Sequence, residues 1–205
     1  GFALIAMALY HATWDLHDQG LLAVDPVNQP LFRLSAQIIA ASFLTLSGIS
    51  LILTHGDQVY WPKFWKRERQ LLLAAGLVSL GSYVLFPQSW IAFGILHHMA
   101  LAGLLGVVLI HQPKFVIVGL AVISFVLPSI ATSAHLNGRW LEWIGLSEQV
   151  TPANDYVPLL PWFGFVLCGL LLGFALQAVP QASAIMAPKP QGRVGKGLVT
   201  LGQHG

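Results

Sequence analysis

The stretch LFRLSAQIIAASFLTLSGISLIL, residues 31–53, carries a single charged side chain, Arg33, and that residue lies near its start. A helix needs roughly 20 mainly apolar residues to cross a bilayer. In lipid no water satisfies the backbone, so such a segment makes its hydrogen bonds internally, as a helix. The stretch therefore predicts a transmembrane α-helix, and its small residues, Gly48 among them, suit close packing against a neighbouring helix.

The composition of the whole chain agrees with a membrane protein. Of its 205 residues, 56% are hydrophobic and 9% are charged, and the mean hydropathy is +0.71, whereas a soluble domain carries about 25% charged residues. The net charge of +2 is spread over short segments and does not favour nucleic acid as a partner. Cys168 is the only cysteine and lies in an apolar run, which excludes a disulfide framework and a cysteine metal site. We expect no metal.

Further apolar segments predict an all-α fold, a polytopic transmembrane bundle of about six spans. Beside residues 31–53, the predicted spans cover residues 2–14, 71–86, 90–110, 115–134 and 157–179. We expect one transmembrane domain over residues 1–180 and a cytosolic linker over 181–205 that leads to a last helix. The chain is already apolar at Gly1, so we expect a fragment truncated at its N-terminus.

Lys and Arg gather on one side of the predicted spans. Eight of the ten fall there, namely Lys63, Lys66, Arg67, Arg69, Lys114, Lys189, Arg193 and Lys196. Arg33 and Arg139 fall on the opposite side. Because cytoplasmic loops carry an excess of Lys and Arg, we predict that the basic loop at residues 62–70 and the C-terminal tail are cytosolic.

A titratable cluster follows the first apolar segment, in the sequence YHATWDLHD. His11 and Asp15 are four residues apart, so on a helix they share one face and can touch. A carboxylate that fixes the tautomer of an imidazole leaves the other ring nitrogen free to act as a general base. We expect His11 and Asp15 to be catalytic and Trp14 to exclude water beside a substrate, while the rest of the cluster marks a solvated helix end.

A pair of histidines lies inside the predicted span FGILHHMALAG. His97 and His98 point about 100° apart around a helix, so they do not face the same neighbour. Ionisable groups inside a membrane mark functional sites, so at least one of the two is predicted to serve a site, and the sequence leaves open which one. Arg33 either snorkels to the interface or contacts an anionic group of a substrate.

The basic segment PKFWKRERQ has two interpretations. Positive-inside topology alone explains its cations, or they hold the phosphates of a nucleotide-like cofactor. The candidate cofactor-binding residues are Lys63, Lys66, Arg67 and Arg69.

Aromatic residues in the long loop and at the start of the last predicted span also have two interpretations. These residues are Trp140, Trp143, Tyr156 and Trp162. Side chains of this kind settle at headgroup depth as interfacial anchors. The alternative is that they stack against a sugar.

Four motifs occur in an order that resembles one bacterial membrane family. They are GFALIAMALYHATWDL, ASFLTLSGIS, IAFGILHHMALAGLLG and DYVPLLPWFGFVLCGLLLG. Together they span nearly the whole chain and resemble the heparan-alpha-glucosaminide N-acetyltransferase catalytic-domain family. The closing LGQHG resembles the point at which that family enters a last helix.

The resemblance implies a transmembrane acyltransferase of the bacterial inner membrane. Acetyl-CoA would be the acyl donor on the cytosolic face, and the acceptor would be a sugar on the outer face. His11 would match the catalytic histidine of related membrane O-acyltransferases, as general base or transient acyl carrier. His97 or His98 would stabilise the oxyanion or position the thioester.

The resemblance also has a departure that bears on the acceptor. The lysosomal enzyme of the family uses a histidine in its first lumenal loop, and Val27 and Asn28 stand at the matching place here. A bacterial envelope glycan or a lipid-linked sugar, modified on an amino sugar or a sugar hydroxyl, is therefore expected in place of heparan. Membrane lipid and this glycan are the expected partners, and the oligomeric state is not predicted.

Two other functions compete with this one. A haem-binding membrane protein would use His11 and either His97 or His98 as axial ligands. A small-solute transporter would line a translocation path with the same polar groups. A non-catalytic scaffold leaves the intramembrane histidines unexplained.

Overall fold

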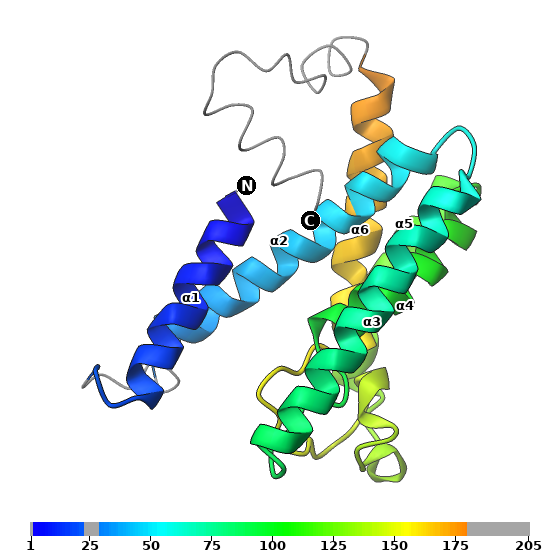
Figure 1. Ribbon diagram of the computed structural model, residues 1–205. Helices are drawn as coiled ribbons and strands as arrows, with labels where there is room; N and C mark the ends of the chain where they lie inside the picture. The colour runs from blue at the N-terminus through cyan, green and yellow to red at the C-terminus, as the bar shows by residue number, and fades with distance from the viewer. Residues whose placement is uncertain (1, 23–28, 180–205) are drawn as a thin grey trace, which may run out of the picture. The chain divides into compact units, whose positions relative to one another are not determined.

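A computed structural model describes residues 2–22 and 29–179, and this part of the chain is all-helical with no β-strand. The α-helices are α1 (Phe2–Asp18), α2 (Pro30–His55), α3 (Trp61–Leu85), α4 (Ile95–Leu109), α5 (Lys114–Ile130) and α6 (Leu159–Ala178), shown in Figure 1. Two short 3-10 turns, η1 (Ala134–Leu136) and η2 (Glu142–Ile144), lie in the long loop before α6. The predicted fold class, all-α, is confirmed.

Within the described residues, α2 and α6 are long and apolar enough to cross a membrane, while α4 and α5 are apolar but shorter. The number of six spans stays a prediction. Large apolar side chains along α3 face outward, and Leu73 and Leu77 are each 70% exposed. Such surfaces are rare on soluble monomers, so they agree with lipid contact. The predicted linker over 181–205, with its three cations, and the position of Val27 and Asn28 lie outside the described residues.

The basic segment at residues 62–70 was predicted to be a loop, and this prediction is wrong. The segment forms the first turns of α3. This helix begins at Trp61, ten residues before the predicted span at Leu71. Pro62 stands in its first turn, where proline is tolerated, and Lys, Arg, Glu and Gln are good helix formers. Conversely, α4 begins only at Ile95, five residues after the predicted start at Trp90, because Gly94 is the N-cap and has an extended backbone.

The described residues form two compact units, one of residues 2–22, 29–43 and 176–179 and the other of residues 44–175. In the first unit, Tyr10 of α1 stacks on Phe32 of α2 with ring centroids 4.1 Å apart. The helix α1 continues through the titratable cluster to Asp18. There His17 Nδ1 lies 3.0 Å from the Leu22 carbonyl oxygen, in agreement with the predicted helix end.

In the second unit, the second half of α2 packs closely against α6. A Cβ on Gly48 would collide with the Val166 carbonyl oxygen, and a Cβ on Gly169 would collide with the carbonyl oxygen of Thr45. The predicted packing role of Gly48 is therefore confirmed. Fully buried Leu44, Ile52, Phe64, Ile117, Leu167 and Leu170 belong to the core around this contact.

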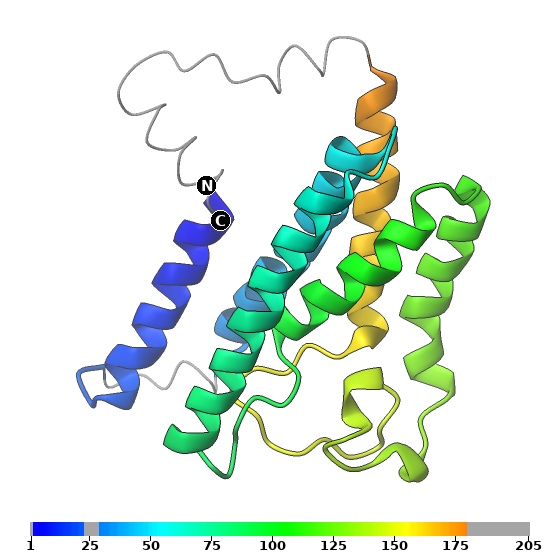
Figure 2. The same cartoon turned by 45° about the vertical axis from the view of Figure 1, so that its right-hand side comes forward.

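The helices α3 and α4 pack along each other, and the loop between them meets the long loop before α6 (Figure 2). The Asn154 N–H donates to the Ser89 carbonyl, and the Val157 N–H donates to the Phe93 carbonyl. The end of α3, the start of α4 and the start of α6 thus meet at one end of the unit, which we call the loop end. The start of α3 and the end of α4 lie at the other end.

Candidate functional site

His97 at the loop end is held by the backbone and by Ser79. Its Nδ1 accepts a hydrogen bond from the Gly94 N–H at 3.3 Å, so the ring proton is on Nε2. Nε2 lies 3.1 Å from Ser79 Oγ, and this hydroxyl donates to the Ile91 carbonyl at 2.6 Å. Nε2–H therefore donates to Ser79. By distance Ser79 and His97 resemble a nucleophile and its base, but their hydrogen bonds run in the opposite direction and instead fix the loop before α4.

His98 has a different environment, because it is fully buried and uses only one ring nitrogen. Its Nδ1 lies 3.1 Å from the Pro158 carbonyl oxygen and 3.3 Å from that of Val157. Carbonyl oxygens only accept, so Nδ1 carries the proton. Nε2 is then an unprotonated nitrogen, and it has no hydrogen-bond partner among the described residues.

These two tautomers decide what the histidine pair can do. Both N–H groups are engaged, that of His97 with Ser79 and that of His98 with backbone carbonyls. The arrangement therefore supplies no free N–H for an oxyanion. It does supply one buried lone pair, on His98 Nε2, which can accept a proton or a hydrogen bond.

Asp155 joins the start of α4 to the segment before α6. Its Oδ2 accepts from the Ile95 N–H at 2.8 Å, and a negative charge is favourable at a helix N-terminus. A Cβ on Gly94 would collide with this carboxylate. Asp155 therefore holds DYVP next to the histidine pair, although it was not singled out as a site residue from the sequence.

A pocket at the loop end is lined by aromatic and charged side chains. Its walls are Ala92, Phe93, Arg139, Glu142, Trp143, Thr151, Ala153 and Tyr156. Trp143 and Tyr156 are two of the four aromatic residues predicted either to anchor the interface or to stack on a sugar. Trp140, in contrast, is 85% exposed.

Glu142 supplies the buried charge of this pocket. Its Oε1 accepts from both the N–H and the hydroxyl of Thr151. The other carboxylate oxygen has no hydrogen bond to any described residue and is not sealed off from solvent. Burial, followed by the Glu142 charge, raises the pKa of Tyr156 to about 12. The phenol thus stays protonated and donates to the Glu142 carbonyl at 2.7 Å.

Arg139 closes one side of the same pocket. Its Nη1 donates to the Trp90 carbonyl at 3.0 Å, and its guanidinium lies 5.0 Å from the centroid of the Trp90 indole. This cation–π contact fixes a guanidinium beside a carboxylate and an aromatic wall. The pocket therefore combines a hydrogen-bond donor and an acceptor with aromatic side chains.

At the opposite end, α2, α3 and α4 meet around an ion pair. Arg67 Nη1 lies 3.1 Å from Glu68 Oε1, and Arg67 Nη2 donates to Ser47 Oγ at 2.9 Å. Glu68 is fully buried, while the side chain of Arg67 is 34% exposed. The carboxylate lies where a Cβ of Gly103 would be. Glu68 Oε2 has no hydrogen-bond partner among the described residues.

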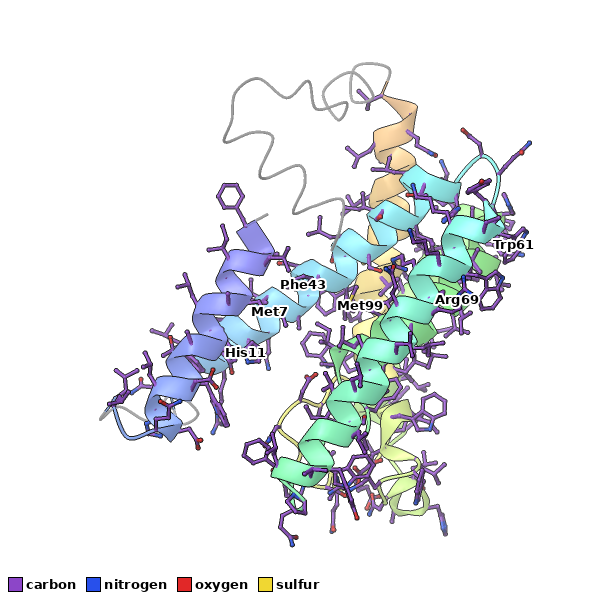
Figure 3. The ribbon with its side chains drawn as sticks, in the orientation of Figure 1. Met7, His11, Phe43, Trp61, Arg69 and Met99 are labelled. Carbon is purple, nitrogen blue, oxygen red and sulfur yellow. The ribbon has the colours of Figure 1, made fainter. Side chains whose placement is uncertain are left out.

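The other predicted cofactor-binding cations differ from Arg67. Lys63, Lys66 and Arg69 are exposed on the first turns of α3, and Figure 3 shows Trp61 and Arg69 near the start of this helix. Arg69 donates from Nε to the Trp65 carbonyl at 3.3 Å. Of the four, Arg67 alone is held by side chains of other residues within the described part of the chain.

The remaining predicted site residues lie in the first unit. His11 and Asp15 are exposed on α1 (His11 is labelled in Figure 3) and form no hydrogen bond or ion pair with each other. His11 makes an edge contact with the Tyr10 ring at 5.7 Å. Trp14 is half-buried, and Arg33 is exposed in the first turn of α2. The structure thus places His11 and Asp15 on one helix without joining them.

Glu68, Ser79 and Glu142 are site residues that the sequence reasoning missed. Glu68 had a readable signal, because buried Phe64, Glu68, Ala75 and Ser82 follow the helical period along one face of α3. Ser79 and Glu142 had none, since the hydrogen-bond partners of their side chains lie 9 to 18 positions away in the chain and are brought close by the fold. Among the described residues, no group of three or more His, Cys, Asp or Glu side chains could hold a metal ion.

Comparison with known proteins adds one result. The family model described as "Heparan-alpha-glucosaminide N-acetyltransferase, catalytic" matches residues 1–205. No curated protein and no solved structure gives a significant match.

Proposed function

The chain belongs over its whole length to the heparan-alpha-glucosaminide N-acetyltransferase catalytic family, and from this membership we propose that it moves an acetyl group from cytosolic acetyl-CoA to an envelope glycan. The acceptor atom is an amino nitrogen or a hydroxyl oxygen of a sugar. The enzyme works in the bacterial inner membrane, with the start of α3 and the C-terminal tail on the cytosolic side.

Beside the family membership, the proposal is supported by the protonation and hydrogen bonding of the two His98 ring nitrogens. Nδ1 is held by two backbone carbonyls, which leaves Nε2 as a buried, unprotonated nitrogen with no partner among the described residues. A buried acceptor without a partner is costly. A substrate N–H or O–H that donates to Nε2 would satisfy it. His98 is thus a proposed acceptor-orienting group or general base, and His97 positions the loop before α4.

His11 keeps its proposed role from the family resemblance. As general base or transient acyl carrier, it would act with Asp15 as its orienting carboxylate. The two are four residues apart on α1 and so share a face of that helix. Trp14 and Arg33 are proposed substrate contacts in the same unit.

The donor and acceptor ends follow from the charges of the second unit. Lys63, Lys66, Arg67 and Arg69 at the start of α3 are proposed to attract the phosphates of acetyl-CoA. The pocket at the loop end, with Trp143, Arg139 and Glu142, is proposed to hold the acceptor sugar. Along α3 the distance from Glu68 to Ser79 is about 16 Å at ~1.5 Å per residue, so the two ends are well separated.

In the proposed reaction the acceptor nitrogen or oxygen bonds to the acetyl carbonyl carbon and gives its proton to an imidazole. The C–S bond of the thioester breaks, and the CoA thiolate leaves and takes up a proton. A general base contributes about 10²–10⁴-fold to such a step. With a transient acyl-imidazole, the transfer would be split into two easier steps.

The test uses the chain in membrane vesicles with acetyl-CoA labelled in the acetyl group and glucosamine or a short amino-sugar oligosaccharide as acceptor. Label on the acceptor and release of free CoA are measured for wild type, His11→Ala and His98→Asn. The control is His135→Asn, which changes an exposed histidine. We expect transfer that falls at least 100-fold in the His11 variant or the His98 variant and is unchanged in the control. The contrary result is that the wild type transfers label to none of the acceptors and instead takes up solute without an acyl donor. That result would contradict the acyltransferase proposal and favour the transporter.

A further inference from the structure

The ion pair at the start of α3 holds the Arg67 guanidinium in a fixed position. A cation that only sets membrane orientation by the positive-inside rule does not need such a fixed position. Arg67 is anchored twice, by Glu68 from its own helix and by Ser47 from α2. Only two of the five N–H donors of a guanidinium are used in these bonds. Part of the Arg67 side chain is accessible from outside the bundle, since it is 34% exposed.

Glu68 is fully buried, and burying a carboxylate costs free energy. A buried carboxylate loses much of its hydration, and its pairing with a cation seldom gives a net gain over apolar packing. What these contacts do provide is orientation of the guanidinium. Arg67 Nη1 lies 3.1 Å from Glu68 Oε1, and Arg67 Nη2 lies 2.9 Å from Ser47 Oγ, so both ends of the guanidinium fork are held. The absence of a Cβ at Gly103 makes room for this carboxylate on α4.

We propose that Arg67 is a preorganised phosphate-binding residue and that Glu68 and Ser47 are its positioning residues. A planar fork with free N–H donors matches the oxygens of a phosphate, whereas an ammonium acts as a point charge. The exposed cations Lys63, Lys66 and Arg69 add long-range attraction without a fixed geometry.

Two sources can supply this phosphate, namely the acyl donor and the headgroup of an anionic phospholipid. The assignment of acetyl-CoA as the source of this phosphate rests on the proposed function, in which acetyl-CoA is the acyl donor. The experiment therefore measures binding as well as turnover.

The test uses the full chain in nanodiscs of neutral phosphatidylcholine, and the probes are CoA, 3′-dephospho-CoA and pantetheine. Binding is measured for wild type, Arg67→Lys, Glu68→Gln and Ser47→Ala. Lys114→Gln is the charge control, because it removes a cation from the same predicted side, one that lies over the Phe174 ring and forms no hydrogen bond or ion pair that joins it to Arg67. A thermal melt of each variant establishes folding, and Ser47→Ala, which removes one hydroxyl, keeps the test informative where Glu68→Gln does not fold.

We expect Arg67→Lys to weaken CoA binding about tenfold or more, although the charge is kept, because the lysine lacks the fork. Glu68→Gln and Ser47→Ala should weaken it in the same direction by smaller factors, raising KM for acetyl-CoA while kcat at saturating donor stays within about twofold. Pantetheine contains no phosphate, so its binding should be the same in the wild type and in all variants. If Arg67→Lys weakens the binding of CoA but not that of 3′-dephospho-CoA, the two losses are not additive and the 3′-phosphate is the group bound at Arg67.

The lipid arm repeats the melts in nanodiscs that contain phosphatidylglycerol. Stabilisation by phosphatidylglycerol that is lost in Arg67→Lys, with CoA binding unchanged, would support the site with lipid as its phosphate source. Equal effects of Arg67→Lys and Lys114→Gln on both probes would overturn the proposal, since only a diffuse field would remain. CoA binding with the expected pattern but no acetyl transfer would leave the phosphate site standing and remove the proposed function.

Discussion

His98 Nδ1 lies 3.1 Å from the carbonyl oxygen of Pro158, so the segment that leads into α6 fixes an imidazole on α4. The donor nitrogen of the ring has a structural partner, while Nε2 has none among the described residues. The two ring nitrogens therefore have separate roles. Substitutions that replace one nitrogen and delete the other can distinguish these roles.

His98→Asn keeps an amide N–H near the position of Nδ1 and removes the nitrogen at Nε2. We expect this variant to fold and to lose about 10²–10⁴-fold in kcat. His98→Phe leaves the Val157 and Pro158 carbonyls without their donor, so we expect it to lose about 1–3 kcal/mol of stability. Thermal melts in detergent and labelled acetyl transfer measure the two effects. Full kcat in His98→Asn would remove Nε2 from the chemistry.

Gly48→Ala and Gly76→Ala test the contact between α2 and α6. A Cβ at Gly48 meets the backbone of α6, whereas a Cβ at Gly76 meets nothing within 4 Å. We expect the first variant to lose about 1–3 kcal/mol by overpacking. The second should be neutral or gain up to about 1 kcal/mol, because alanine is the better helix former. Equal melting temperatures for both variants would show that the helices can separate without cost.

Tyr156 gives a pH dependence in the alkaline range. An unfolded tyrosine ionises near pH 10, while burial and the Glu142 charge raise the pKa in the folded chain to about 12. Below pH 10 the phenol is neutral in both states, so its contribution is fully present. As the pH rises from 10 to 12, the unfolded state ionises first and stability falls.

Tyr156→Phe cannot ionise, so its melting temperature should fall less than that of wild type between pH 9.5 and 11.5. At pH 7 the variant should be less stable, because the hydrogen bond to the Glu142 carbonyl is lost. Tyr83→Phe serves as control, since the Tyr83 ring is 57% exposed. A wild-type slope retained by Tyr156→Phe would assign the alkaline loss to other groups.

Trp143→Leu tests the acceptor pocket at the loop end. Leucine keeps an apolar wall but removes the aromatic face beside Phe93, 6.0 Å between ring centroids. We expect KM for the amino-sugar acceptor to rise about tenfold, a loss of ~1.4 kcal/mol, while KM for acetyl-CoA stays constant. Trp140→Leu, at an exposed tryptophan outside the pocket, is the matched control. An equal rise of the acceptor KM in both variants would point to interfacial anchoring instead.

Much of the architecture could be predicted, because helices in lipid depend on local composition. The apolar runs located α2 and α6 within two residues of their observed bounds. The start of α3 was missed because hydropathy alone ignores helix formers such as the lysines and arginines after Pro62. The site was less accessible to sequence reasoning, since the Ser79–His97 and Arg67–Ser47 hydrogen bonds join residues 18 and 20 positions apart.

The amino-acid sequence alone established a helical, lipid-facing chain, its family and the residue types that can carry chemistry. These properties follow from hydropathy, from charge and from motifs that are local in the chain. The roles of the two adjacent histidines were decided only in three dimensions. The Val157 carbonyl, which with that of Pro158 accepts a hydrogen bond from His98 Nδ1–H, is 59 positions away. Only the packing of α4 against the start of α6 determines which ring nitrogen carries the proton and which has no partner among the described residues.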